Sequence, residues 1–102
     1  MKVQVLHIEE CPSWEEAGVR ARQALDGAGL ADVAVEFVLI RTPTEAASTA
    51  FAGSPTIVVD GEDLFPSDGQ TTSLACRVYF TEHGLAGTPT RTQIERALRN
   101  HL

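Results

Sequence analysis

Two cysteines carry the most reactive side chains of this chain. Cys11 and Cys76 are its only cysteines, and they lie in distant parts of the sequence. A thiolate attacks disulfides and also binds soft metal ions. Sequence spacing does not tell whether the two sulfurs meet. They could form a redox pair, hold a soft ion together, or stay apart, with Cys76 as a small buried residue.

The surroundings of Cys11 favour reactivity. Cys11-Pro12 follows an apolar run and precedes a helical pattern, so its sulfur is expected at a helix N-terminus. Backbone N–H groups and the helix dipole stabilise a thiolate there, whereas the neighbouring Glu9 and Glu10 oppose it. We expect a moderately reactive and partly exposed Cys11 at a loop tip. Two helix starts compete: Cys11 as N-cap, or Ser13 as N-cap with Glu16 completing a capping box.

Hydrophobic periodicity predicts the elements that hold the cysteines in place. Turn signals at Asp60-Gly61 predict a hairpin, and Thr42 and Thr90 are expected to cap helices with the residues three positions later. Residues 66–73 and 84–89 are expected to be loops, and residues 74–80 fit a helix, a strand or an ordered loop. The predicted strands are residues 2–8, 33–40, 56–60 and 62–65, and the predicted helices are residues 12–28, residues 42–50 and a last one after residue 90.

The predicted order is β-α-β-α-β-β-α. A helix between two neighbouring strands makes a right-handed parallel unit, and the hairpin adds antiparallel strands. We therefore expect an α/β fold, with a four-stranded mixed sheet and flanking helices, in a single domain over residues 1–102.

With this order, the chain resembles the thioredoxin-like superfamily over nearly its whole length. The resemblance also rests on Cys11 within Cys11-Pro12-Ser13-Trp14, between the first strand and the first helix. A third match is Ser54-Pro55-Thr56 before the third strand, where the superfamily keeps a cis-proline. The chain is similar as well to small thioredoxin-family proteins of actinobacteria, some of which are labelled alkylmercury lyase.

The resemblance implies roles for individual residues. Cys11 would be the nucleophile of thiol–disulfide exchange, and Cys76 a possible resolving thiol. Dithiol members carry a second cysteine three residues after the first, where this chain has Trp14. A cis-proline would offer the backbone of Ser54 to an extended partner. The residues expected to bind substrate are Pro12, Trp14, Ser54, Pro55 and Thr56.

Composition excludes several function classes. The formal net charge is −6, which disfavours nucleic acid and anionic membrane surfaces as partners. The apolar run of residues 33–40 is far shorter than a membrane span, and polar residues interrupt the first ten positions. We therefore expect a cytoplasmic protein, in a compartment that keeps thiols reduced. His7, His83 and His101 show no metal-ligand spacing, so neither a cofactor nor a resident metal is expected.

Three hypotheses follow. The first is a possible thiol-disulfide oxidoreductase that exchanges disulfides with a protein or a low-molecular-weight thiol. The second is a non-catalytic module in which Cys11 and Cys76 hold or traffic a soft ion such as mercury or copper(I). The third is an interaction domain with inert cysteines. Trp14, in place of a second cysteine, weakens the usual reductase mechanism without favouring either alternative.

Overall fold

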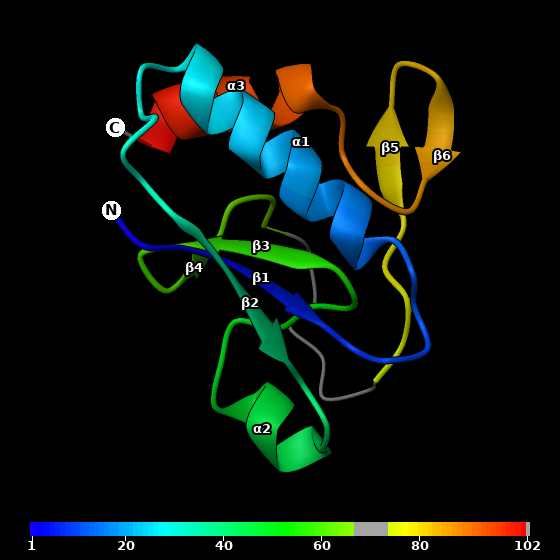
Figure 1. Ribbon diagram of the computed structural model, residues 1–102. Coiled ribbons are helices and arrows are strands. Elements are labelled where there is room, and N and C mark those ends of the chain that lie inside the picture. Colours follow the sequence, from blue (N-terminus) through cyan, green and yellow to red (C-terminus); the bar gives the residue numbers. More distant parts are fainter. Residues whose placement is uncertain (67–73, 102) are drawn as a thin grey trace.

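A four-stranded mixed sheet forms the centre of the molecule (Figure 1). The computed structural model describes residues 1–66 and 74–101. Strand order in the sheet is β2-β1-β3-β4, and β5 and β6 form a separate antiparallel hairpin. The strands are β1 (Val3–His7), β2 (Val35–Leu39), β3 (Thr56–Val59), β4 (Glu62–Asp63), β5 (Tyr79–Thr81) and β6 (Gly84–Ala86). The helices are α1 (Trp14–Gly27), α2 (Pro43–Ala47) and α3 (Arg91–His101).

The strand pairings agree with the predicted topology. β1 lies inside the sheet, parallel to β2 and antiparallel to β3. The β3–β4 turn has positive φ at Asp60 (52°) and Gly61 (86°), as a tight hairpin turn requires. The sequence predictions of an α/β class and of this four-stranded mixed sheet are confirmed.

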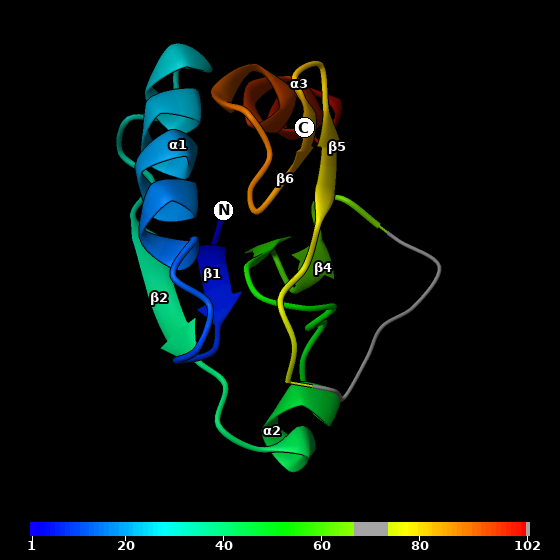
Figure 2. The same cartoon turned by 90° about the vertical axis from the view of Figure 1, so that its right-hand side faces the viewer.

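Two apolar clusters cover the two faces of the sheet. On one face Val3 and Ile57 pack with Leu25 of α1 and Leu98 of α3. Figures 1 and 2 show α1 and α3 side by side over this face, with α2 at the far end of the sheet. The cluster on the opposite face contains Leu6, Ile8, Cys11, Ile40, Ala46, Phe51 and Val58. Side chains therefore alternate between the two clusters along β1 and β3, as the period of two demands.

Side-chain hydrogen bonds cap the N-termini of α2 and α3, but not that of α1. The Thr42 Oγ1 accepts a hydrogen bond from the Glu45 N–H, at 3.1 Å. Thr90 and Gln93 form the predicted reciprocal capping box, at 3.1 and 2.9 Å. Of the two predicted starts of α1, the one with Ser13 as N-cap is confirmed in position, but its capping bond does not form. The alternative start, with Cys11 as N-cap, is wrong.

Several predicted boundaries shift. α1 begins at Trp14 rather than Pro12, and α2 ends at Ala47 rather than near residue 50. β4 is shorter than its prediction. Residues 84–89 were expected to be a loop, yet β6 forms there, because residues 79–81 supply a pairing partner across a short turn. The expected polar loop of residues 66–73 falls, after residue 66, outside the described residues.

Candidate functional site

Cys11 is a core residue in this structure. It lies between β1 and α1, and only 2% of its surface is exposed. It packs in the same cluster as Leu6, Ile8 and Phe51. The expectation of a partly exposed Cys11 is therefore wrong. The chain turns at the exposed Glu9 and Glu10 and then re-enters the protein, which buries the next side chain.

Cys76 meets Cys11 in a disulfide. Their Cα atoms are 5.8 Å apart, within the ordinary range for this bond. Unlike Cys11, Cys76 is an exposed residue. The question that the sequence left open is answered: the two cysteines form a pair, 65 positions apart in the chain.

Ser54 binds the segment that carries Cys76. Its N–H donates a hydrogen bond to the Ala75 carbonyl, and its own carbonyl accepts one from the Arg77 N–H, both at 2.9 Å. These bonds form an isolated parallel bridge between Ser54 and Cys76. The Ser54 hydroxyl accepts a third bond from the Ile8 N–H at 3.1 Å. The backbone groups expected to dock a partner are therefore occupied by the chain itself.

The Ser54–Pro55 peptide bond is cis, as the resemblance predicted. The Pro55 carbonyl accepts a hydrogen bond from the buried Tyr79 hydroxyl, at 2.5 Å. Burial raises the pKa of this phenol, so it remains a donor. Thr56 is fully buried, and its hydroxyl donates to the Gly53 carbonyl and accepts from the Ala52 N–H. Its hydroxyl therefore serves the turn before β3 and does not face solvent.

Arg77 anchors the segment after Cys76. Its guanidinium lies 2.9 Å from the Asp63 carboxylate and 4.6 Å from the centre of the Tyr79 ring. Burial raises the pKa of Asp63, against the opposing effects of a backbone hydrogen bond and of Arg77. Gly53, at φ 109°, lies so close that a Cβ there would be 2.8 Å from the Arg77 Cβ. Sequence reasoning missed Arg77 and Tyr79. The run of β-branched and aromatic residues Val78-Tyr79-Phe80 was the available strand signal.

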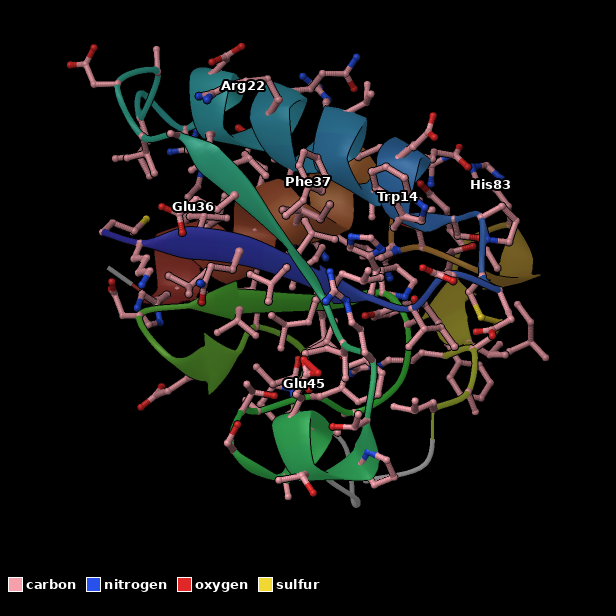
Figure 3. The ribbon with its side chains drawn as sticks, turned by 60° about the horizontal axis from the view of Figure 1, so that its bottom comes forward. Trp14, Arg22, Glu36, Phe37, Glu45 and His83 are labelled. Carbon is pink, nitrogen blue, oxygen red and sulfur yellow. A yellow bond between two sulfur atoms is a disulfide. The ribbon has the colours of Figure 1, made fainter. Side chains whose placement is uncertain are left out.

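Trp14, the first residue of α1, belongs to an aromatic cluster. Its ring stacks on His7, at 4.4 Å between ring centres, and meets the edge of Phe37 at 5.4 Å. Figure 3 shows Trp14 and Phe37 between α1 and β2. Trp14 is half-buried, and its packing against these rings accounts for its position. Pro12, two residues before it, is exposed.

His7 is buried beneath Trp14. Its surface is 8% exposed, and no described residue offers a hydrogen-bond partner to its Nδ1. Burial lowers the pKa of the imidazole, although a backbone interaction with Ile8 opposes the shift. The ring is therefore neutral at neutral pH.

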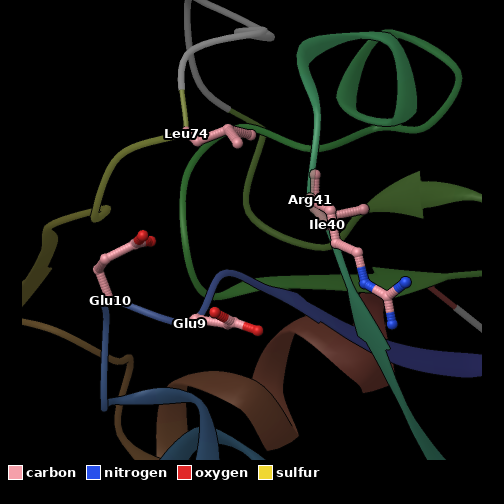
Figure 4. Close-up of a pocket in the computed structure, with 5 residues that line it drawn as sticks. All are labelled: Glu9, Glu10, Ile40, Arg41 and Leu74. Carbon is pink, nitrogen blue, oxygen red and sulfur yellow. The ribbon is translucent and has the colours of Figure 1, made fainter.

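A cleft of about 260 Å³ opens next to the chain segments of both cysteines (Figure 4). Glu10, the residue before Cys11, lines it, and so does Leu74, two residues before Cys76. The remaining lining residues are Glu9, Ile40 and Arg41. The site thus combines a disulfide, a cleft lined by chain neighbours of both cysteines, and a backbone bridge at the exposed Cys76.

Comparison with other proteins adds no assignment. The chain matches no protein-family model, no curated protein and no solved structure. Within residues 1–66 and 74–101, no three His, Cys, Asp or Glu side chains converge as metal ligands. In the same ranges, no helix has the length and apolar character to cross a membrane.

Proposed function

We propose that this protein is a thioredoxin-like thiol–disulfide exchange protein whose redox pair is Cys11 and Cys76. The observation that carries the proposal is the Cys11–Cys76 disulfide beside the bridge at Ser54. The order of the main elements and the cis bond before β3 support the thioredoxin-like assignment. This assignment extends the coarser finding of a mixed α/β fold.

The reaction is a two-electron exchange. Two external thiols reduce the Cys11–Cys76 bond, become one external disulfide, and leave two protein thiols that carry the two hydrogens. In the opposite direction an external disulfide is reduced and the protein pair is oxidised. The partner is a protein or a low-molecular-weight thiol, and the compartment we propose is the cytoplasm.

The exposure of Cys76 separates this proposal from that of an inert structural crosslink. Exposed disulfides are the labile and catalytic ones, whereas structural disulfides resist reduction. We expect a bond that joins a buried cysteine to an exposed one to be open to attack without unfolding. Cys76 thus supplies the second sulfur of the pair. A cysteine at the position of Trp14 is therefore not required.

Equilibration with glutathione buffers of graded redox poise tests the function. The native protein is trapped by a thiol-specific alkylating reagent, and mass spectrometry counts the modified cysteines. We expect one reversible transition in which both cysteines change together, at a potential above about −300 mV. A bond that stays oxidised at more reducing potentials until the protein unfolds would identify a structural crosslink and refute the proposal. The Cys76→Ser variant controls for alkylation of Cys11 alone.

The same sulfur pair supports the second candidate, binding of a soft ion. The 5.8 Å between the two Cα atoms brings both thiolates of the reduced pair to one place. Two thiolates suit soft ions such as mercury or copper(I). Mercury(II) added to the reduced protein would then protect both thiols from alkylation at one ion per chain, and the Cys76→Ser variant would lose this stoichiometric protection.

A further inference from the structure

We propose that external thiols attack this disulfide at Sγ of Cys76, so that Cys76 carries the mixed disulfide and Cys11 is the leaving group and resolving thiol. The inference rests on the proposed exchange function and assigns the order of events within it. It reverses the expectation from sequence, in which Cys11 is the nucleophile.

The burial of the two cysteines differs sharply. Cys11 is 2% exposed, and the side chains of Ile8, Ile40 and Phe51 share its cluster. Cys76 is exposed, as is Ala75 before it, and Val78 after it is 58% exposed. A reagent in water therefore meets the sulfur of Cys76 first.

The geometry of exchange sharpens this difference. A thiolate attacks one sulfur of a disulfide roughly in line with the bond that breaks, from the side opposite the leaving sulfur. Attack on Sγ of Cys11 would have to reach a residue that is 2% exposed and packs within the core cluster. For Sγ of Cys76, the approach starts outside the core. The buried sulfur is thus suited to leave and the exposed sulfur to be attacked.

The structure also holds Cys76 in place while it reacts. The two backbone hydrogen bonds of Ser54 flank it, through Ala75 and Arg77. Arg77 is fixed in turn by the ion pair with Asp63 and by a hydrogen bond to the Phe65 carbonyl. None of these contacts involves a sulfur atom, so we expect them to keep Cys76 within reach of Cys11 after the bond opens. Resolution by Cys11 therefore needs no large rearrangement.

The steps balance as follows. An external thiolate forms a bond to Sγ of Cys76 while the Cys76–Cys11 bond breaks, and its electron pair leaves on Cys11 as a thiolate. A second external thiolate then attacks the external sulfur of the mixed disulfide, which releases an external disulfide and the Cys76 thiolate. The two thiolates take up the two protons that the external thiols lost. For oxidation of the protein the same steps run backwards, and the Cys11 thiolate attacks Sγ of Cys76.

The assignment is tested by mapping the first adduct. The oxidised native protein is mixed briefly with 2-mercaptoethanol, quenched with acid and digested at low pH, and mass spectrometry locates the adduct. We expect at least tenfold more adduct on Cys76 than on Cys11. An adduct mainly on Cys11 would overturn the assignment and leave the exchange function standing. Without an adduct on either cysteine, the exchange function itself would fail, and the assignment with it.

Single-cysteine variants provide an independent measurement. Cys11→Ala leaves the surface thiol, and Cys76→Ala leaves the buried one. We expect the Cys76 thiol to react with an aromatic disulfide reagent at least tenfold faster than the Cys11 thiol in the folded proteins. In strong denaturant the difference should disappear, which controls for intrinsic reactivity. Equal rates in two folded variants would overturn the proposal.

Discussion

Reduction of the Cys11–Cys76 bond should lower the free energy of unfolding by about 4 kcal/mol. The perturbation is a reductant such as dithiothreitol, or the Cys76→Ser substitution, which removes the bond for good. The bond joins residues 65 positions apart. In the loop-entropy model, a crosslink over a loop of that size removes enough freedom from the unfolded chain to stabilise the fold by about 4 kcal/mol. Since domains of this size are stable by only about 5–15 kcal/mol, the loss is large.

Urea unfolding followed by the fluorescence of Trp14 measures the effect. Trp14 is the only tryptophan, and its ring stacks on His7 in the folded state. With a denaturant dependence of about 1.5 kcal/mol per molar urea, the midpoint should fall by about 3 M on reduction. Cys76→Ser should unfold at the midpoint of the reduced protein and should not respond to reductant. A midpoint that moves by less than about 0.5 M would refute the loop argument.

Three further predictions follow from buried contacts. Acidification from pH 7 to 5 should destabilise the fold, because burial lowers the pKa of His7 and the unfolded chain binds the proton that the native ring excludes. The stability that the neutral His7 ring contributes is fully present above about pH 6.5 and is lost as the pH falls below that value. His7→Phe should therefore flatten the dependence of the urea midpoint on pH. Tyr79→Phe should cost about 1–3 kcal/mol in urea unfolding, because it leaves the buried Pro55 carbonyl without its donor. Gly18→Ala should stabilise α1 by about 0.5–1 kcal/mol only in a Phe37→Ala background, since the new Cβ would otherwise collide with the Phe37 ring.

Controls exist for each of these. The matched control for His7→Phe is His83→Gln, a change at an exposed histidine. If His7→Phe retained the full loss of stability on acidification, another group would be responsible. A cost below about 0.5 kcal/mol for Tyr79→Phe would mean that another donor, such as water, replaces the phenol. Equal effects of Gly18→Ala with and without the Phe37 ring would show that the ring moves aside freely.

Local sequence signals predicted the parts of the fold that depend on near neighbours. The apolar run of residues 2–8 contains β1, and Asp60-Gly61 forms the predicted turn. Thr90 and Gln93 bond to each other across three positions. In each case the interacting groups lie within one turn or one strand, so their spacing in the sequence decides their geometry.

The site depended on contacts that sequence spacing does not encode. The approach of Cys76 to Cys11 results from pairing between Ser54 and residues 75–77. Hydrophobic periodicity does not predict a single pairing of this kind between distant segments. The burial of Cys11 results from a turn that returns the chain to the core directly after Glu10. The sequence left residues 74–80 undecided and predicted a loop where β6 forms, because the hairpin is largely exposed: Phe80 and Leu85 are 83% and 65% exposed. Within this hairpin only Tyr79 is buried, so no alternation of apolar residues marks the two strands in the sequence.

The disulfide also determines how the molecule transmits force. It closes a covalent ring that contains α1, β2, α2, β3 and β4, while β1 and α3 lie on the two tails outside it. When the ends are pulled, tension passes from β1 through the sulfur bridge to the C-terminal tail, and the ring carries no load along its backbone. Once the bond is reduced, the 65-residue separation can extend by up to about 220 Å. The redox state of one pair of sulfurs therefore sets whether this chain behaves as a short tether or a long one.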